Sequence, residues 1–192
     1  MSERFQIVVA DPPWAFNDKL KMSAVKRGAE ANYSTLTLTD IIALPVGEWC
    51  QPNALLALWV PSSLLNAGLE VMLSWGFTQK QVFTWVKTSS AGLAFGMGRH
   101  FRGCTEHALI GTRGKIQPLN KSQRCADLSP ALPHSRKPEG LQDALDKMYP
   151  GPKLEMFARR ARPGWTCVGN ESPDVCTDIR DWRPTFKVTD AD

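Results

Sequence analysis

The 192-residue sequence predicts an α/β fold in which a mostly parallel, twisted sheet carries helices on both faces. The first observation is that short apolar runs rich in β-branched residues alternate with segments whose apolar residues recur every three to four positions. The second is the composition, with 43% hydrophobic and 22% charged residues, which is typical of a folded globular protein. The length corresponds to one domain, and no run of 18 apolar residues predicts a membrane span.

Two strands and a helix are expected in the first part of the chain. Residues 5–10 and 54–60 are apolar runs that each end at a proline-containing loop, and we interpret them as buried strands. A helix follows the second strand, with Ser62 or Ser63 as its N-cap and Gly76 as its C-terminal stop. Its core face is predicted to consist of five apolar residues at helical spacing: Leu64, Leu65, Leu69, Met72 and Leu73.

The second half of the chain is expected to add four strands and one helix. The helix begins near Pro138 and ends before Pro150. The strands are expected at residues 81–87, 105–112, 153–158 and 166–170. Only about seven residues separate the last two strands, whereas a parallel crossover normally needs a dozen or more. These two strands therefore form either a hairpin or an abbreviated crossover.

Charge is distributed unevenly along the chain. Residues 80–165 hold 15 basic and 6 acidic side chains, a net charge of +9, whereas the whole chain has a net charge of +4. A basic stretch of this kind is either a solvated face or a binding surface for nucleic acid. Both alternatives stay open at this point.

The segment Asp11-Pro12-Pro13-Trp14 follows the first strand and is the strongest chemical signal. In open α/β sheets, ligands bind beyond the carboxyl ends of the strands, so the segment lies where a site is expected. Each proline keeps its carbonyl but lacks an N–H, and the Asp11 carboxylate adds a charged acceptor. These acceptors suit a ligand group with two N–H donors, and Trp14 offers a flat face for an aromatic ring. The alternative is that the prolines only stop the strand while Trp14 fills the core.

An exocyclic aromatic amine fits this set of acceptors. Such an amine is a poor nucleophile because its lone pair is delocalised into the ring. Acceptors at both of its hydrogens, one from the Asp11 carboxylate and one from the Pro12 carbonyl, would pull the nitrogen towards a tetrahedral shape and free the lone pair. The segment therefore predicts alkylation of an exocyclic amine.

Further motifs follow the tetrapeptide in order, and together they carry a family resemblance. They are Asn32-Tyr33-Ser34-Thr35-Leu36, Leu58-Trp59-Val60, Ser74-Trp75-Gly76-Phe77, Trp85-Val86-Lys87-Thr88, Thr105-Glu106-His107, Ser135-Arg136-Lys137-Pro138, Leu154 to Arg159 (LEMFAR) and Trp165 to Glu171 (WTCVGNE). Over residues 5–171 the sequence resembles the MT-A70 family of N6-adenine methyltransferases. The resemblance implies a Rossmann-like fold that uses S-adenosylmethionine (SAM), with a permuted motif order in which the catalytic segment comes first.

The resemblance also implies roles for residues at the acceptor. The implied catalytic residues are Asp11, Pro12, Pro13 and Trp14. Asp11 and Pro12 would hold the target amine, Pro13 would fix the loop, and Trp14 would help to hold the base. Three more residues match family positions near the acceptor: Tyr33, Glu106 and Lys137.

The residues implied for SAM come mostly from the last motifs. They are Asp11, Lys137, Glu155, Arg159, Arg162, Asn170 and Glu171. Glu155, Arg159, Asn170 and Glu171 match positions around the ribose and adenosine. Lys137 and Arg162 are expected at the carboxylate, because Arg162 stands where members carry Asn. Longer members read the cofactor adenine with an acidic residue upstream of the motif, and with only ten residues before Asp11 that role is unassigned.

Basic residues near the motif are candidate phosphate contacts. Lys26 and Arg27 lie in a basic insertion after the motif, and Arg99 and Arg102 lie in the glycine-rich loop 92–103, which we interpret as a mobile lid. A base in a duplex must be extruded before Trp14 can stack on it, and phosphate contacts would offset that cost.

The expected protein is one methyltransferase domain over residues 1–171, followed by an acidic tail, 172–192, that packs on it or trails from it. We expect methyl transfer to the 6-amino group of adenine in DNA, because the chain is compact like bacterial or phage DNA-modifying members. RNA is the alternative acceptor. The alternative from another class is a catalytically inactive paralogue that binds nucleic acid.

The same interpretation predicts the partners and the cellular compartment. DNA is the expected partner, a homodimer stays open, and neither a membrane nor a metal is expected. The five cysteines form no CxxC pair and have no regular spacing, which predicts neither a disulfide framework nor a zinc site. A reducing cytoplasm is the expected compartment, that of the host if the protein is phage-encoded.

Overall fold

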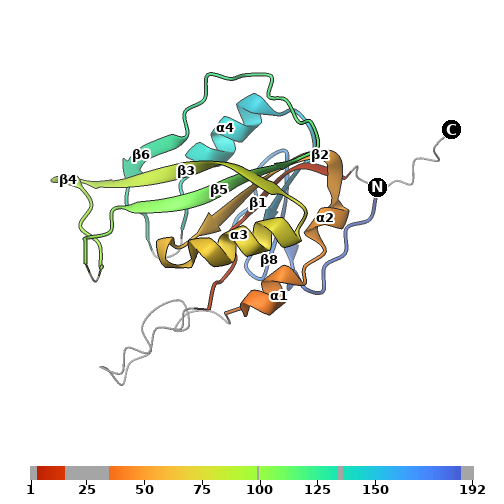
Figure 1. Cartoon of the computed structure of the whole chain (residues 1–192), viewed down its shortest axis with the longest axis horizontal. Coiled ribbons are helices and arrows are strands. Elements are labelled where there is room, and N and C mark those ends of the chain that lie inside the picture. Colours follow the sequence, from red (N-terminus) through yellow and green to blue (C-terminus); the bar gives the residue numbers. More distant parts are fainter. Residues whose placement is uncertain (1–3, 16–34, 99, 134–135, 187–192) are drawn as a thin grey trace.

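A computed structural model describes residues 4–15, 35–98, 100–133 and 136–186 of the chain (Figure 1). Within these residues, one nine-stranded sheet forms the centre of the molecule, and helices lie against both of its faces. No helix in the described ranges is long and apolar enough to cross a membrane.

The described residues contain nine strands and four α-helices. The strands are β1 (Phe5–Ala10), β2 (Cys50–Val60), β3 (Thr78–Ser89), β4 (Gly92–Leu93), β5 (Thr105–Arg113), β6 (Ala126–Pro130), β7 (Lys153–Met156), β8 (Trp165–Gly169) and β9 (Val175–Cys176). The helices are α1 (Leu38–Ile42), α2 (Val46–Trp49), α3 (Leu65–Ser74) and α4 (Gly140–Met148). The strand order is β4-β3-β5-β2-β1-β7-β8-β9, and β6 pairs with β3.

The sheet is mixed, and the predicted motif lies in its parallel part. Strands β2, β1, β7, β8 and β9 run parallel to one another, whereas β5 is antiparallel to both β2 and β3. Among the described residues, five of the eight strand pairings are parallel, which confirms the predicted α/β class with a mostly parallel sheet. Strand β1 lies between β2 and β7, so the chain continues to opposite sides of β1 in the two halves of the sheet. In open α/β sheets such a switch point is where ligands bind.

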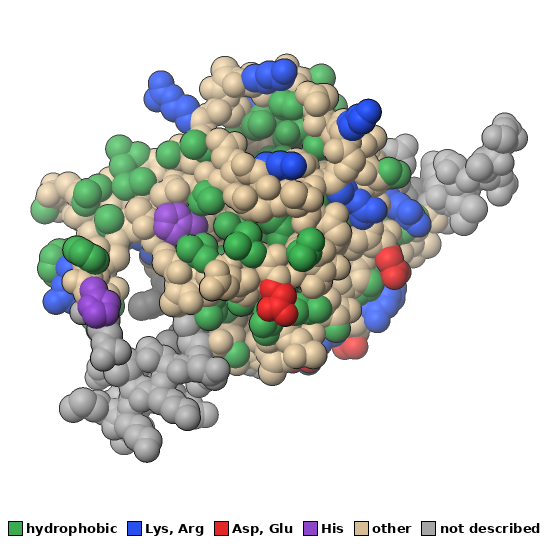
Figure 2. All heavy atoms as spheres, in the orientation of Figure 1, with side chains coloured by type: hydrophobic (Ala, Val, Ile, Leu, Met, Phe, Trp, Pro, Cys, Tyr) green, Lys and Arg blue, Asp and Glu red, His purple; other side chains and the backbone are tan. Residues whose placement is uncertain are grey.

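The structure corrects the predicted core face of α3. Three leucines that we expected in the core are exposed to 37%, 42% and 72%: Leu65, Leu69 and Leu73. The buried residues of α3 are Gly68, Val71 and Met72. At Gly68 a Cβ atom would lie only 2.6 Å from Cγ2 of Val60 on β2, so the helix packs its smallest residue against the sheet. The leucines therefore contribute to the hydrophobic surface visible over α3 in Figure 2.

The predicted N-cap of this helix is also wrong, whereas its end is confirmed. Ser62 and Ser63 lie in a 3-10 turn over Ser62–Leu64, and α3 begins without a side-chain cap. The 3-10 turn satisfies one of the N–H groups at the start of the helix, because Leu64 N–H donates to the carbonyl of Pro61 at 2.8 Å. Gly76 has a φ of 82° and ends the helix as expected.

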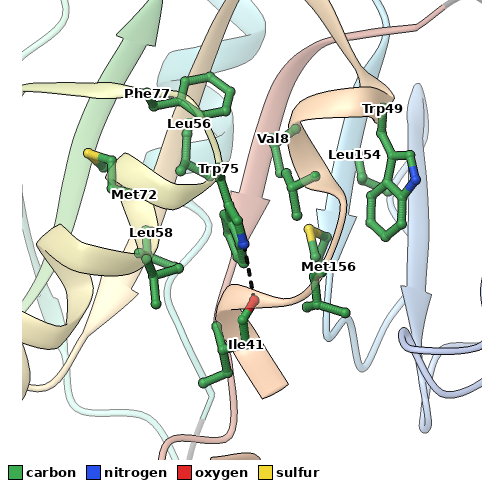
Figure 3. Close-up of a cluster of buried hydrophobic side chains, with 14 of the residues drawn as sticks. Val8, Ile41, Trp49, Leu56, Leu58, Met72, Trp75, Phe77, Leu154 and Met156 are labelled. Atoms are coloured by element: carbon green, nitrogen blue, oxygen red, sulfur yellow. Dashed lines mark hydrogen bonds between the residues drawn. The ribbon is translucent and has the colours of Figure 1, made fainter. Parts of the chain in front are cut away.

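Alternating side chains of β1 are buried on both faces of the sheet. Val8 belongs to a core cluster with α1, α2 and α3, whereas Ile7 and Val9 belong to a second cluster with α4. Figure 3 shows the first cluster, in which Trp75 Nε1 donates to the carbonyl of Ile41 in α1 at 3.0 Å. Burial on both faces explains why residues 7–10 of β1 form an unbroken apolar run.

The last two predicted strands are parallel and joined by an abbreviated crossover. The eight residues 157–164 between β7 and β8 contain no helix. Beyond β8, the tail adds β9 to the sheet, and Trp182 packs against Trp49 of α2 with ring centroids 5.1 Å apart. The described part of the tail therefore packs on the domain.

Candidate active site

The carboxyl ends of the parallel strands meet at one edge of the sheet. Ala10 of β1 pairs with Leu58 of β2 on one side and Met156 of β7 on the other, and Met156 pairs with Val168 of β8. The segments that leave these strands carry predicted functional residues: Asp11 after β1, Arg159 after β7, and Asn170 and Glu171 after β8. Strand register thus brings residues from the early and the late parts of the sequence together at one site.

Backbone hydrogen bonds fix the loop 11–14. Trp14 N–H donates to the carbonyl of Pro12 at 2.8 Å, and Leu36 N–H donates to the carbonyl of Pro13 at 2.9 Å. The indole Nε1 of Trp14 donates to the carbonyl of Trp59 at 2.9 Å, and Trp14 is only 5% exposed. The Pro12 carbonyl keeps one lone pair for a ligand, because a carbonyl oxygen has two. Trp14 fills the core with most of its surface and presents only a small part of it to the site.

Three cavities meet at this edge, and we name each after one of its residues. The Trp14 cavity, of about 420 Å³, is lined by the loop 11–14 and the end of β2. The Glu155 cavity, of about 380 Å³, is lined by the end of β7 and the start of α4. The Asn170 cavity, of about 100 Å³, lies at the end of β8. Asp11 and Arg159 line all three, so the cavities converge at these two side chains.

A chain of alternating charges lines the Trp14 cavity. Lys137 Nζ lies 2.7 Å from Asp11 Oδ2 and 3.4 Å from Glu106 Oε2, and Glu106 also pairs with Lys87. Burial acts to lower the pKa of Lys137, but the attraction of Asp11 and Glu106 outweighs it and raises that pKa above its ordinary value. Burial acts to raise the pKa of Glu106, and the two lysines hold it below its ordinary value. Lys137 and Glu106 are therefore charged at neutral pH.

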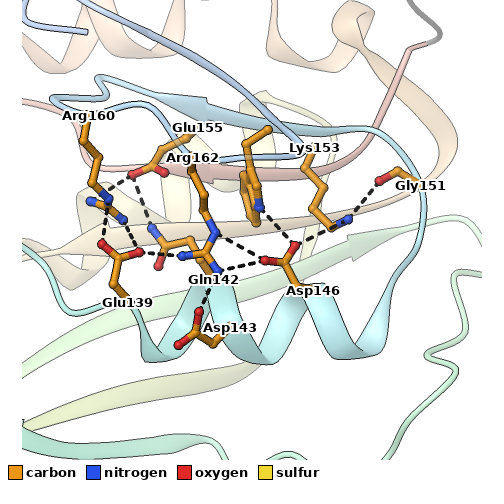
Figure 4. Close-up of polar contacts among 10 residues, drawn as sticks. Glu139, Gln142, Asp143, Asp146, Gly151, Lys153, Glu155, Arg160 and Arg162 are labelled. Atoms are coloured by element: carbon orange, nitrogen blue, oxygen red, sulfur yellow. Dashed lines mark hydrogen bonds and ion pairs between the residues drawn. The ribbon is translucent and has the colours of Figure 1, made fainter. Parts of the chain in front are cut away.

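Buried polar atoms without hydrogen-bond partners line the Glu155 cavity. Among the described residues these are Trp59 Nε1, Gln142 Oε1 and Glu155 Oε2. The other oxygen of Glu155 accepts from Gln142 Nε2 at 3.3 Å and lies 3.6 Å from Arg160, as Figure 4 shows. Burial raises the pKa of Glu155 despite the opposing attraction of Arg160. Unpartnered polar atoms are rare in native interiors, and these three leave one donor and two acceptors available to a polar ligand or to water.

The Asn170 cavity combines polar side chains with an apolar wall. Asn170 and Glu171 contribute an amide and a carboxylate, which are the acceptors that vicinal hydroxyl groups need. Phe157 and Ile179 contribute apolar surface. Asp178, from the C-terminal segment, adds a second carboxylate that was not among the predicted site residues.

Arg162 is not among the residues that line these cavities. It binds three carboxylates in or immediately before α4, shown in Figure 4: Glu139, Asp143 and Asp146. These ion pairs tie the crossover between β7 and β8 to α4, so the geometry gives no support to the expected cofactor contact. Arg136 and Arg160 line the Glu155 cavity instead. Arg136 and Arg160 were not predicted as site residues, although each is adjacent in sequence to a residue that was.

Four expected substrate contacts lie outside the described residues and stay predictions: Tyr33, Lys26, Arg27 and Arg99. Arg102 is exposed and lies over the ring of Phe95, 5.1 Å from its centroid. Gly96 and Gly103 of the same loop line the Trp14 cavity, and Gly96 N–H donates to the carbonyl of Gly103 at 3.0 Å. The loop thus forms one wall of that cavity, and its role as a lid stays a prediction.

The predicted basic region is partly neutralised by ion pairs. Four of its cations pair with acidic side chains inside or beside the site: Lys87, Lys137, Arg160 and Arg162. Lys153 pairs with Asp146 of α4. On the face shown in Figure 2, Lys and Arg side chains are scattered, with no single dense patch. Part of the positive charge of residues 80–165 is therefore paired with acidic side chains within the fold.

A Rossmann-like methyltransferase needs a donor and an acceptor that meet beyond the carboxyl ends of the sheet strands. The cavities that converge at Asp11 meet this need. The model of the MT-A70 family matches residues 5–171, and the chain belongs to this family.

Relatives from distant organisms match nearly the whole chain. The Type II methyltransferase M.MunI of Mycoplasma sp is 29% identical over 195 residues, which cover 92% of this chain and 82% of that protein. The human N(6)-adenosine-methyltransferase catalytic subunit METTL3 is 28% identical over 195 residues, which cover 94% of this chain and 32% of METTL3. An Arabidopsis thaliana N(6)-adenosine-methyltransferase MT-A70-like protein is 28% identical over 191 residues, covering 96% of this chain and 26% of the relative.

Proposed function

We propose that this chain transfers a methyl group from SAM to the 6-amino group of adenine in DNA. The observation that carries the proposal is the convergence of three cavities at Asp11, because a direct transfer needs donor and acceptor to meet at one point. Membership of the MT-A70 family supports the same chemistry.

The residues of the Glu155 and Asn170 cavities fit SAM. The amino-acid end of SAM carries an ammonium group, which suits the unpartnered oxygens of Gln142 and Glu155, so Glu155 takes a different role here from the ribose contact that the resemblance implies. Its carboxylate suits a cation such as Arg136, and its ribose hydroxyls suit Asn170 and Glu171. When bound, SAM supplies an electrophilic methyl group on a sulfonium.

The Trp14 cavity suits the adenine that accepts the methyl group. Lys137 binds Oδ2 of Asp11, which leaves Oδ1 and the free lone pair of the Pro12 carbonyl for the two N–H groups of the amine. Lys137 thus orients the carboxylate for the amine. After transfer, the surplus proton on the nitrogen passes to Asp11 Oδ1 or to water. No strong general base is needed, because a protonated aromatic amine is acidic.

We favour DNA over RNA because of how far each similarity extends. The matched region covers 82% of the Type II methyltransferase M.MunI but only about a third of METTL3. The relative that is matched over most of its length is a Type II methyltransferase, which supports DNA as the proposed macromolecular partner. RNA is the second candidate, because several matched relatives bear the name N(6)-adenosine-methyltransferase.

The proposal is tested by expressing the chain in a bacterium without adenine methylation. N6-methyladenine is then mapped separately in DNA and RNA, with the Asp11→Ala variant as the control for host activity. We expect marks in DNA that vanish in the variant. Marks confined to RNA would favour the second candidate, and the absence of marks in both polymers would favour an inactive paralogue.

A further inference from the structure

Three large apolar side chains protrude from the loop between β4 and β5. Met97, Phe101 and Phe95 are exposed to 92%, 90% and 80%, and no other large hydrophobic side chain in the described ranges is as exposed. In Figure 1 the segment between β4 and β5 extends away from the sheet. Single exposed apolar residues are ordinary, but three within seven residues are typical of an interaction surface. We call these three residues the apolar tip.

Backbone contacts hold the two arms of this loop together. Ala94 N–H donates to the carbonyl of Lys87 at 2.8 Å, and Gly96 N–H donates to the carbonyl of Gly103 at 3.0 Å. A Cβ atom at Gly96 or Gly98 would overlap a carbonyl oxygen of the returning arm, so this close approach requires glycine at both positions. The loop therefore holds the apolar tip in a defined place.

The apolar tip lies at the edge of the cavity proposed for the acceptor base. Gly96, Met97 and Gly103 line the Trp14 cavity together with the loop 11–14. A base that leaves a duplex loses its stacking and leaves a gap between its neighbours. Trp14 is only 5% exposed, so its ring replaces little of that stacking. Another apolar surface beside the cavity has to compensate, and Met97 joins this cavity to the rest of the apolar tip.

The charge around the apolar tip indicates what it binds. Residues 87–105 hold three basic and no acidic side chains. Arg102 lies over the ring of Phe95, 5.1 Å from its centroid, so a cation and an aromatic ring form one surface. Nucleic acid offers phosphates to the cation and bases to the apolar side chains, whereas a purely apolar partner would gain nothing from the positive charge.

We propose that the apolar tip enters the base stack of duplex DNA and fills the step that the target adenine leaves, with Met97 and Phe101 as the inserted side chains. Proteins that separate base steps insert apolar side chains of this kind, phenylalanine and methionine among them. The inference rests on the proposed function, because it concerns how the DNA substrate is held at that site. It assigns a role to side chains that carry no charge and touch no cofactor.

A DNA duplex with one central abasic site tests the proposal without turnover and without knowledge of the target sequence. The abasic site leaves a vacant step, so insertion there costs less unstacking than in the otherwise identical intact duplex. We expect the wild type to bind the abasic duplex roughly fivefold or more tightly, the lower end of what base–aromatic stacking contributes. In the double variant Met97→Ala/Phe101→Ala this preference should fall to within about twofold. Fluorescence anisotropy at one salt concentration measures the four affinities.

The double variant Leu119→Ala/Leu128→Ala is the matched control, because these leucines are 78% and 70% exposed and line none of the three cavities. It should keep the wild-type preference. A wild type that binds both duplexes equally, or a Met97→Ala/Phe101→Ala variant that keeps the full preference, would overturn the inference and leave the proposed methyl transfer standing. The wild-type comparison decides even if a variant does not fold.

Light scattering on the same proteins separates DNA from a protein partner. If the wild type self-associates and Met97→Ala/Phe101→Ala abolishes that association without changing the preference between the duplexes, the apolar tip contacts a second copy and the inference is wrong. A wild type that binds neither duplex contradicts DNA as the acceptor, and so contradicts the proposed function itself.

Discussion

Asp11 is the residue on which the proposed chemistry depends. Asp11→Ala removes the acceptor for the target amine, and we expect it to lower kcat by about 10³-fold or more, while affinity for the cofactor changes little. Asp11→Asn keeps one oxygen acceptor without the charge and should retain a trace of activity. Incorporation of radiolabelled methyl groups into DNA measures both effects. Wild-type incorporation by the alanine variant would contradict the assignment of Asp11.

We expect the Glu155 carboxylate to lower the free energy of unfolding and to contribute to cofactor binding. Burial raises its pKa above the ordinary 4.5, so ionisation of the carboxyl costs more in the folded than in the unfolded protein. The cost of ionisation is absent below pH 4.5 and grows as the pH rises through the raised pKa. Glu155→Gln should therefore increase the free energy of unfolding at pH 7, and this gain should vanish towards pH 4.

Urea unfolding at the two pH values measures the Glu155 effect, and calorimetry should show weaker binding of S-adenosylhomocysteine by the same variant. Glu48→Gln is the control, because Glu48 is exposed on α2 and lines none of the three cavities. A Glu155→Gln protein that is less stable than the wild type at pH 7 would show that the ion pair with Arg160 outweighs burial.

At the scale of elements, α3 offers a direct test of which face packs against the sheet. Gly68→Ala adds a Cβ atom 2.6 Å from Cγ2 of Val60, and we expect this overpacking to cost about 1 to 3 kcal/mol. Leu73→Ala should change stability by only about 0.5 kcal/mol or less, because Leu73 is 72% exposed. Denaturant unfolding distinguishes the two. If Leu73→Ala lowered the free energy of unfolding by about 2 to 5 kcal/mol, Leu73 would be buried, as the sequence predicted.

Hydrophobic periodicity predicted that α3 exists but not how it is rotated. Leucines at helical spacing define a helix, but which face is buried depends on how closely the backbone can approach the sheet, and only Gly68 opposite Val60 decides that. Helix α1 was missed although its signal is present. Thr37 and Asp40 form a capping box, but the five residues Leu38–Ile42 are too few to show a period. Strands β4 and β9, of two residues each, are likewise too short to carry an alternating pattern.

For the whole molecule, association with DNA should depend strongly on salt. Because several basic residues are neutralised by internal ion pairs, the insertion with Lys26 and Arg27 becomes a leading candidate for phosphate contacts. Replacing both by Ala should weaken binding to all sequences and reduce the slope of log Kd against log salt by up to about 2. Fluorescence anisotropy over a salt series measures the slope.

Replacing Lys80 and Lys147 by Ala is the matched control for the salt series. Both are exposed and line none of the three cavities. If this pair reduces the slope as much as Lys26 and Arg27, phosphate contact is spread over the molecule.

The sequence could predict which strand-end residues share the site. It could not predict the contacts that depend on how α4 and the C-terminal segment pack. The resemblance assigned Asp11 and Asn170 to the same cofactor, and they meet because the carboxyl ends of parallel strands share one edge of the sheet. The ion pairs of Arg162 could not be predicted, because they depend on where α4 packs, which the chain order does not reveal. Asp178 was missed because the course of the chain after β8 follows from the pairing of β9.

The central position of β1 has a consequence for biosynthesis. Gly151 N–H, just before β7, donates to Oε1 of Gln6 in β1, 145 residues earlier in the chain. At a translation rate of 5 to 20 residues per second, β7 follows β1 from the ribosome roughly 7 to 30 s later. Throughout that interval the nascent chain carries an apolar strand with at least one unpaired edge, which other strands can join. The yield of folded protein in a cell is therefore expected to depend on how well chaperones cover the first ten residues during synthesis.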